Sequence, residues 1–325
     1  MIATRRSTII SLGIVALLAG PSPALAEDYP TKPVQIITQA AAGSGPDVIG
    51  RILADQLTQR LGQQVLIINR PGAGGLIAAQ AAAAAQADGY TLYMPSSSAL
   101  MVLPQTHAHL PFNFHRDFVP IGMIGTQPML ITASPTLGVS TLAELIALAK
   151  KEPGKILYAG NSPGTIPALT GDMLEQRAGI NMTFVPYPGV AAALTDMRGG
   201  RISVIIESVA GLAGAIQDGS VKLLAVASDK RLQQFPDIAT VAETLPGFDA
   251  TGWFALLART GTPNSIVQKM SSALRASLAD AVLKEKFTKL GTVATPMSPI
   301  EMQAFIQREE KNWIPVVRGA GLAMQ

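Results

Sequence analysis

Two short segments rich in glycine and hydroxyl side chains stand where an expected strand gives way to an expected helix. They are Gly43-Ser44-Gly45 and Gly160-Asn161-Ser162-Pro163-Gly164-Thr165. The first turn of a helix presents unpaired backbone N–H groups and the positive end of the helix dipole, and glycine lets this backbone come close to a ligand. Both segments are therefore candidate sites for an anion such as a carboxylate. Glycine and serine also build ordinary tight turns, and these residues alone do not separate the two interpretations.

The second segment also matches a catalytic pattern. Residues 160–164 fit the G-x-S-x-G nucleophile elbow of hydrolases, which follows a strand. That mechanism needs a histidine base after the serine in the chain, whereas His107, His109 and His115 all precede Ser162. We therefore predict no catalytic residue, and a serine hydrolase stays a remote alternative.

Neither a cofactor nor a metal ion is predicted. Residues 72–77 are similar to a dinucleotide-binding loop, but Ile77 takes the place of the third small residue. Asn69-Arg70-Pro71 also separates these glycines from the preceding strand, where the fingerprint needs an immediate turn. The three histidines stand among prolines and phenylalanines, which favours a packed or solvated loop over a metal site.

The N-terminus has the organisation of a secretory signal peptide over residues 1–26. Arg5 and Arg6 precede an apolar run over residues 9–19, and the segment closes on Ala24-Leu25-Ala26. The run falls well short of the roughly 20 residues that an anchoring helix needs. We expect cleavage after Ala26 and export to the periplasm, by either the general or the twin-arginine route.

Charge and cysteine content narrow the class of protein further. The chain has 25 basic and 22 acidic residues, and loss of Arg5 and Arg6 with the signal brings the remainder close to neutral. No basic run supports nucleic-acid binding. Cysteine is absent, which excludes disulfides, thiol catalysis and a lipid-modified cysteine anchor.

Short apolar segments alternate with helical patterns in two series, which indicates parallel βαβ units. The first series has strands expected at residues 34–38, 65–68 and 90–94, and the second at 156–159, 183–185, 202–206 and 223–227. Ser140-Thr141-Leu142-Ala143-Glu144 and Ser298-Pro299-Ile300-Glu301 have the pattern of helix starts. The segments at 128–132 and 253–258 are either paired crossover strands of a hinge or ordinary buried strands.

Several motifs spread over residues 29–321 give the chain a family resemblance. The most specific is Asn69-Arg70-Pro71-Gly72-Ala73-Gly74-Gly75; others are Asp88-Gly89-Tyr90-Thr91-Leu92, Arg116-Asp117-Phe118, Val185-Pro186-Tyr187, Leu194-Thr195-Asp196 and residues 236–243. In these the chain resembles the Bug-type extracytoplasmic solute receptors, the substrate-binding components of tripartite tricarboxylate transporters.

The resemblance implies an α/β periplasmic binding protein of type II, a Venus flytrap. Its two lobes would each have a mostly parallel sheet and be joined by two crossover strands. Lobe 1 would comprise residues 27–126 and 252–325, and lobe 2 residues 127–251. The implied function is capture of a small carboxylate by a monomer and its delivery to the membrane subunits of the transporter. An orphan receptor that serves a sensor protein is the alternative.

Loop positions and resemblance together define an expected ligand site. It comprises Ala41, Ala42, Gly43, Ser44, Gly45, Asp47, Ser96, Ser97, Ser98, Asn161, Ser162, Gly164, Thr165, Tyr187, Glu207 and Ser208.

Departures from the family pattern bear on the ligand. Ala40 lacks the family's aromatic side chain, and Leu100 and Ala168 stand where histidine is frequent. These three residues predict a roomier, less polar distal cleft and favour a bulky or aromatic acid. Glu207-Ser208 replaces the usual Asp-Ser pair, and a glutamate there accepts hydrogen bonds from a hydroxyl or amine but repels a dianion.

Overall fold

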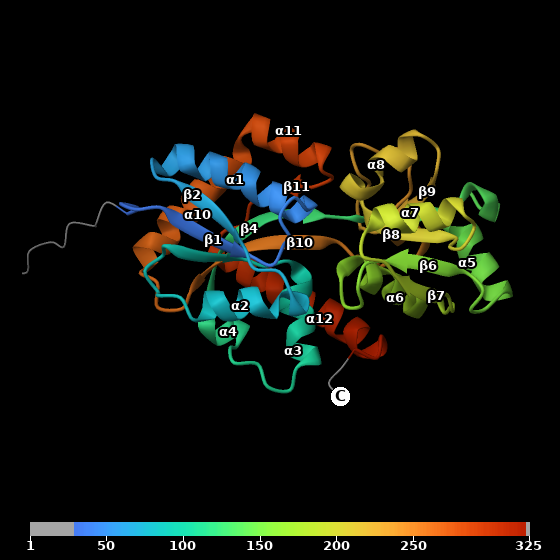
Figure 1. Ribbon diagram of the computed structural model, residues 1–325, viewed down its shortest axis with the longest axis horizontal. Helices are drawn as coiled ribbons and strands as arrows, with labels where there is room; N and C mark the ends of the chain where they lie inside the picture. The colour runs from blue at the N-terminus through green and yellow to red at the C-terminus, as the bar shows by residue number, and fades with distance from the viewer. Residues whose placement is uncertain (1–28, 323–325) are drawn as a thin grey trace, which may run out of the picture.

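Two α/β lobes lie side by side along the long axis of the molecule in the computed structural model, which describes residues 29–322 (Figure 1). The signal peptide expected at residues 1–26 lies outside the described residues. Within the described part, no helix has the length and apolar character needed to cross a membrane.

Lobe 1 is built on a six-stranded sheet in the order β11-β4-β10-β3-β1-β2. Its strands are β1 (Val34–Thr38), β2 (Val65–Asn69), β3 (Thr91–Met94), β4 (Phe118–Gln127), β10 (Gly252–Arg259) and β11 (Val293–Ala294). β1 pairs in parallel with β2 and β3, whereas β10 runs antiparallel between β3 and β4. β1 buries Ile36 on one face and Ile37 on the other, as expected for a strand that helices cover on both sides.

Helices cover both faces of this sheet. They are α1 (Gly45–Leu61), η1 (Ala73–Gly75), α2 (Leu76–Ala83), α3 (Ser97–Thr106), α4 (Phe114–Asp117), α10 (Asn264–Ala279), α11 (Ala281–Lys289) and α12 (Pro299–Gly319). One apolar core joins α1, α10 and α11 to the sheet, and the other joins α2, α3 and α12 to it.

Lobe 2 has a five-stranded sheet in the order β7-β6-β8-β5-β9. Its elements are β5 (Met129–Ala133), η2 (Pro135–Leu137), α5 (Leu142–Lys151), β6 (Leu157–Gly160), α6 (Ile166–Ala178), β7 (Thr183–Pro186), α7 (Val190–Arg198), β8 (Val204–Ser208), α8 (Val209–Gln217), β9 (Lys222–Val226) and α9 (Val241–Thr244). β6 is parallel to β7 and β8, and β5 is antiparallel to β8 and β9.

The predicted crossover strands do not pair with each other. β5 lies in the sheet of lobe 2 and β10 in the sheet of lobe 1, and each runs against its neighbours. β5 and β10 are antiparallel to their neighbours because the chain enters each of them directly from the other lobe. A parallel strand would require a βαβ connection within the same lobe. The sheets are therefore mixed, although β1 to β4 in one and β6 to β9 in the other share a direction.

The chain passes between the lobes at two adjacent points. Gln127 at the end of β4 is paired with Gly252 at the start of β10. Only Pro128 separates Gln127 from the start of β5, and the N–H of Ala250 donates to the carbonyl of Ala227 in lobe 2 at 3.2 Å. Both connections are short and hydrogen-bonded, so they hold the lobes together at a defined place.

Helix α12 is a third link, because it packs against α3 and β4 of lobe 1 and against α6 of lobe 2. Its Glu309 is 7% exposed and accepts hydrogen bonds from both tryptophans, 2.8 Å from Trp253 Nε1 and 3.1 Å from Trp313 Nε1. Burial raises the pKa of Glu309 above its ordinary value of 4.5, and the charge of Asp249 acts in the same direction.

The raised pKa of Glu309 predicts how stability responds to pH. The folded state binds this proton more tightly than the unfolded chain, so its contribution is fully present below pH 4.5 and is lost as pH rises through the folded pKa. The stability advantage of the wild type over Glu309→Gln should therefore shrink with rising pH, by about 1.4 kcal/mol for each unit of pKa difference. Urea unfolding at several pH values measures this, and an advantage that does not change with pH would contradict it.

Glu285→Gln provides the contrast. Lys289 lowers the pKa of exposed Glu285, so the ionised carboxylate stabilises the folded protein and this contribution is lost as pH falls. The stability lost in Glu285→Gln should therefore be larger at high pH than at low pH.

Candidate functional site

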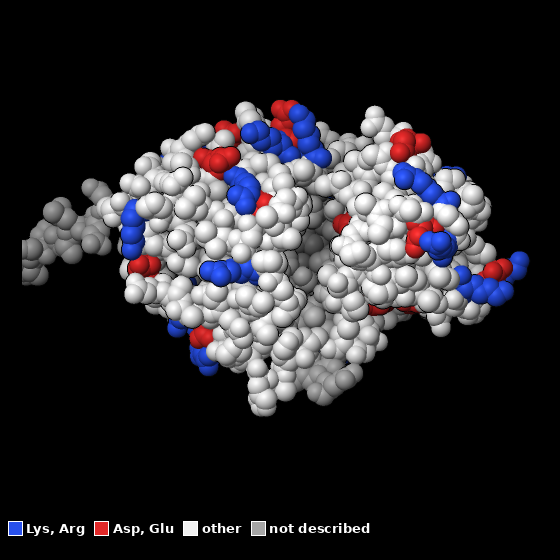
Figure 2. Space-filling view, in the orientation of Figure 1, with Lys and Arg blue, Asp and Glu red and all other residues white. Residues whose placement is uncertain are grey.

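A cavity of about 430 Å³ lies between the lobes (Figure 2), within the size range of small-molecule sites. Lobe 1 and the crossovers contribute Ser44, Gly45, Pro46, Ser96, Ser97, Ser98, Gln127, Gly252, Trp253 and Phe254. Lobe 2 contributes Met129, Asn161, Thr165, Ile166, Pro167, Pro188, Gly189, Val190, Glu207, Ser208, Ala210 and Gly211.

Five helices begin at the wall of this cavity. The residues that precede them are Ser44 before α1, Ser96 before α3, Thr165 before α6, Gly189 before α7 and Ser208 before α8, and all five line the cavity. None of these side chains caps its own helix. The N–H groups that the first turns retain and the positive ends of the helix dipoles can therefore face an anion, except at α8, where Glu207 accepts from the N–H of Ser208.

The hydroxyl groups on the lobe 1 side form a short polar strip. Ser96 Oγ lies 2.5 Å from Gln39 Nε2, which donates to it, and 2.8 Å from Ser98 Oγ. Ser97 Oγ accepts from the backbone N–H of Trp253 at 3.3 Å. Ser44 Oγ is buried and has no hydrogen-bond partner within the described structure. A buried hydroxyl without a partner costs free energy, so a ligand atom at this position would be stabilising.

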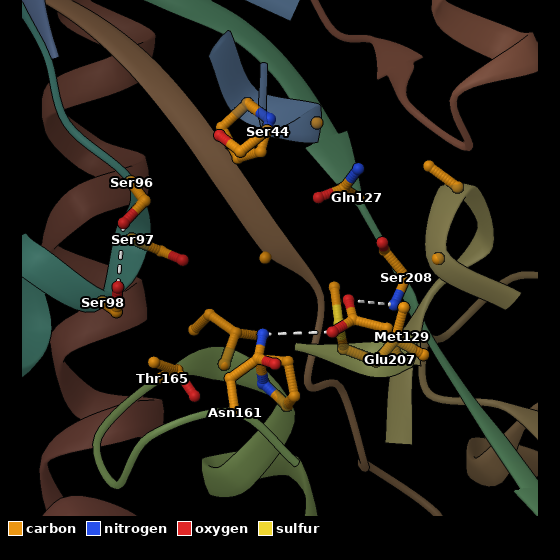
Figure 3. A pocket seen from close by; sticks show the side chains of 18 of the residues that line it. Ser44, Ser96, Ser97, Ser98, Gln127, Met129, Asn161, Thr165, Glu207 and Ser208 are labelled. Carbon is orange, nitrogen blue, oxygen red and sulfur yellow. Dashed lines mark hydrogen bonds between the residues drawn. The ribbon is translucent and has the colours of Figure 1, made fainter. Parts of the chain in front are cut away.

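Glu207 is the one residue with an ionisable side chain among the described residues that line the cavity. Its carboxylate accepts from Asn161 Nδ2 at 3.0 Å and from the backbone N–H of Ser208 at 2.7 Å (Figure 3). Burial raises the pKa of Glu207, and these two hydrogen bonds oppose that rise. Ser44 and residues 96–98 lie on the opposite side of the cavity from Glu207 (Figure 3).

Many of the residues expected at the ligand site line this cavity. They are Ser44, Gly45, Ser96, Ser97, Ser98, Asn161, Thr165, Glu207 and Ser208. Seven others stand outside its lining: Ala41, Ala42, Gly43, Asp47, Ser162, Gly164 and Tyr187. Ala41, Ala42 and Ser162 are exposed to solvent, and Tyr187 donates to Asp196 Oδ2 at 2.7 Å.

Asp47 supports the first loop rather than facing the cavity. It is 2% exposed, and its Oδ2 accepts from the backbone N–H of Gly43 at 2.8 Å and from Arg51 Nε at 2.9 Å. Its Oδ1 accepts from Asn69 Nδ2 at 2.8 Å, and the same amide nitrogen donates to the carbonyl of Ala40 at 2.9 Å. Because these donors occupy both oxygens, Asp47 fixes the loop that presents Ser44, and Asn69 of the Asn-Arg-Pro-Gly motif completes the support.

Other lining residues gave little local signal in the sequence. Met129 and Phe254 lie in the two apolar segments that were expected as strands, whereas Gln127 at the end of β4 and Gly252 at the start of β10 fell outside the predicted strands. Trp253, the first residue of the predicted strand at 253–258, lines the cavity and is 1% exposed, so it contributes both to the cavity wall and to the packed interior.

Ala40, Leu100 and Ala168 do not shape the cavity. They are 8%, 4% and 2% exposed and lie outside its lining, packed into the protein interior. The expectation of a roomier distal cleft, and with it the preference for an aromatic acid, therefore loses its structural basis. Among the described residues, no group of three or more histidines and carboxylates is placed to hold a metal ion.

Comparison with known proteins identifies the family. Residues 49–322 match the model for the tripartite tricarboxylate transporter family receptor, TctC. The chain belongs to this family. It is 34% identical over 317 residues to Protein BugT of Bordetella pertussis, an alignment that covers 97% of each chain.

Two solved structures of the same fold contain ligands. Rpa4515 of R. palustris, solved with adipate, has a TM-score of 0.82 and 29% identity, over 92% of this chain and all of its own. MatC of Rhodopseudomonas palustris, solved with bound malate, has a TM-score of 0.75 and 26% identity, over 89% of this chain and all of its own. These similarities establish the type of two-lobed binding protein that the resemblance implied.

The role of Asp47 predicts a stability effect. Burial alone would raise the pKa of Asp47, but the hydrogen bonds from Arg51, Asn69 and the Gly43 N–H lower it below 3.8. Asp47→Asn places an NH₂ group against these donors, so the free energy of unfolding at neutral pH should fall by about 1–3 kcal/mol. The deficit should shrink as pH falls through the folded pKa, because the wild type then loses the same charge.

Urea unfolding followed by circular dichroism measures this difference. Asp55→Asn, an exposed position on the same helix, is the matched control and should change stability by less than about 0.5 kcal/mol. Equal stability of Asp47→Asn and the wild type would show that the loop does not depend on this carboxylate.

Proposed function

We propose that this protein binds a small carboxylate in the periplasm and delivers it to the membrane subunits of a tripartite tricarboxylate transporter. The observation that carries the proposal is the convergence of five helix starts on one cavity between the lobes. The bound adipate and malate of two related structures support a carboxylate as the ligand class.

The cavity is suited to reversible capture of an anion. No lysine, arginine or histidine is among the described residues that line it, so backbone N–H groups, hydroxyls and helix dipoles supply the attraction. Each helix start contributes about 0.3–1 kcal/mol to binding a negative charge, and up to about 2 kcal/mol where it is partly buried. Several such contributions hold a carboxylate without a strong ion pair, which suits a receptor that must release its ligand.

Lobe closure is the proposed mechanism. The lobes, residues 27–126 with 252–325 and residues 127–251, would rotate about the crossovers where Gln127 pairs with Gly252. A ligand held by the helix starts of both lobes would stabilise the closed form, because only closure brings both sets of donors onto it. The closed monomer would then dock on the membrane subunits.

We also propose that the protein is exported and that it has no catalytic activity. The segment 1–26 would direct the chain to the periplasm and be removed after Ala26. Ser162 of the G-x-S-x-G pattern lies exposed and outside the cavity lining, which argues against a hydrolase in this cavity.

The ligand class can be tested by thermal unfolding of the mature protein with matched acids and amides. Adipate or malate should raise the midpoint in a concentration-dependent manner, whereas the corresponding diamides should not, because amides lack the negative charge that the helix starts attract. Equal shifts for an acid and its amide would contradict the carboxylate assignment.

Ser44 provides a site-specific variant for the same test. Ser44→Ala removes the buried hydroxyl without a partner and should weaken carboxylate binding about tenfold in calorimetry. Ser272→Ala, on α10 of lobe 1 and outside the cavity lining, is the matched control. Unchanged affinity in Ser44→Ala would remove this hydroxyl from the site.

Closure is tested by small-angle X-ray scattering. At saturating ligand the radius of gyration should decrease, because the lobes approach each other about the crossovers. An unchanged profile at saturation would indicate a rigid cavity.

A further inference from the structure

The cavity proposed for a carboxylate already contains a carboxylate of its own. Glu207 stands on lobe 2, and no other ionisable side chain is among the described residues of the lining. A second negative charge placed beside it would be repelled, and no cation in the lining compensates. A ligand whose two ends differ in charge therefore fits this cavity better than a dicarboxylate does.

Glu207 occupies an anion position at the start of α8. One carboxylate oxygen accepts from the N–H of Ser208, the residue that precedes this helix, and the other accepts from Asn161 Nδ2. Gly211 in the first turn of α8 lies against the side chain, because a Cβ there would come within 2.7 Å of Glu207 Cγ. The Glu207 carboxylate is thus held in a fixed position. It accepts hydrogen bonds from Asn161 and Ser208, so these donors are less available to a ligand carboxylate.

Lobe 1 has the opposite character. The starts of α1 and α3 face the cavity. Among the described residues, lobe 1 adds no acidic side chain to the lining, and none of them is a hydrogen-bond partner of the buried Ser44 Oγ. Figure 3 places Ser44 and residues 96–98 across the cavity from Glu207. The carboxylate of a ligand is therefore best accommodated on lobe 1, with its other end near lobe 2.

We propose that the ligand is an aminocarboxylate, whose carboxylate lies at the α1 and α3 starts of lobe 1 and whose ammonium group donates to Glu207 on lobe 2. This inference rests on the proposed function and names its ligand class. A carboxylate accepts about four hydrogen bonds, so Asn161 and Ser208 leave capacity for an ammonium donor. Such a donor also supplies the charge compensation that a partly buried carboxylate lacks in the free protein.

Calorimetry with the mature protein tests the class directly, using pairs of acids of equal carbon number. ε-Aminocaproate is compared with adipate, and γ-aminobutyrate with succinate. Within each pair, one terminal carboxylate is replaced by an aminomethyl group and the rest of the molecule is unchanged. The two ligands therefore differ in the charge of the end that would lie near lobe 2. The amino acid should bind more tightly than its dicarboxylate partner, on the order of tenfold or more.

Glu207→Gln tests the residue. The amide keeps the size of the side chain and removes its charge, so binding of ε-aminocaproate should weaken on the order of tenfold or more while binding of adipate strengthens. Glu285→Gln, on the exposed surface of α11, removes one negative charge outside the cavity and should leave the preference unchanged. Circular dichroism establishes that each variant is folded, and the wild-type comparison stands independently of the variants.

The outcomes separate this inference from the function on which it rests. Tighter binding of dicarboxylates by the wild type, with affinity that rises as pH falls, would show that Glu207 takes up a proton and would overturn the aminocarboxylate assignment while leaving the carboxylate receptor intact. An unchanged preference in Glu207→Gln would overturn the role of this residue. Failure of every acid and amino acid to bind would overturn the proposed function and this inference together.

Discussion

The direction of the parallel strands is the constraint on which the cavity depends. β1 and β3 in lobe 1 and β6, β7 and β8 in lobe 2 all lead, at their carboxyl ends, into helices whose first turns line the cavity. Because each strand leads into its helix at the same edge of its sheet, that edge gathers several dipole ends and unpaired N–H groups. Two such edges face each other across the cavity, whose described lining contains no basic side chain.

Carboxylates in this protein perform different tasks according to their surroundings. Asp47 is surrounded by donors and fixes the loop that presents Ser44, whereas Glu309 holds two tryptophans where α12 bridges the lobes. Hydrogen bonds lower the pKa of Asp47 against the effect of burial, and burial raises that of Glu309. Glu207 accepts from two donors, as Glu309 does, but it differs from both other carboxylates in that it lines the cavity.

The crossovers connect binding to the movement of the lobes. Gln127, Met129, Gly252 and Trp253 belong both to the passages between the lobes and to the cavity lining, so a ligand in the cavity touches the segments about which closure would occur. Trp253 also donates to Glu309 on α12, a helix that packs against both lobes. The cavity and the crossovers thus share residues, and the hydrogen bond between Trp253 and Glu309 connects them to α12.

Local patterns in the sequence determined much of the fold. Apolar runs located β1 at its observed bounds and most other strands within two residues. The predicted helix start at Ser298 is the N-cap of α12, where the structure shows a capping box with Glu301. The long β4 and the short β11 were not predicted, because β4 contains Pro120, Gly122 and Gly125 and β11 has two residues. Hydroxyl residues before helices, such as Ser44 and Thr165, could be proposed for the site because a helix start is a local feature with a known electrostatic consequence. The tertiary structure alone decided that Asp47 turns inward to the loop, that Ala40, Leu100 and Ala168 are buried away from the cavity, and that β5 and β10 run antiparallel to their neighbours. These outcomes depend on contacts between residues far apart in the chain, such as Asn69 with Ala40 and Gln127 with Gly252, which no local pattern records.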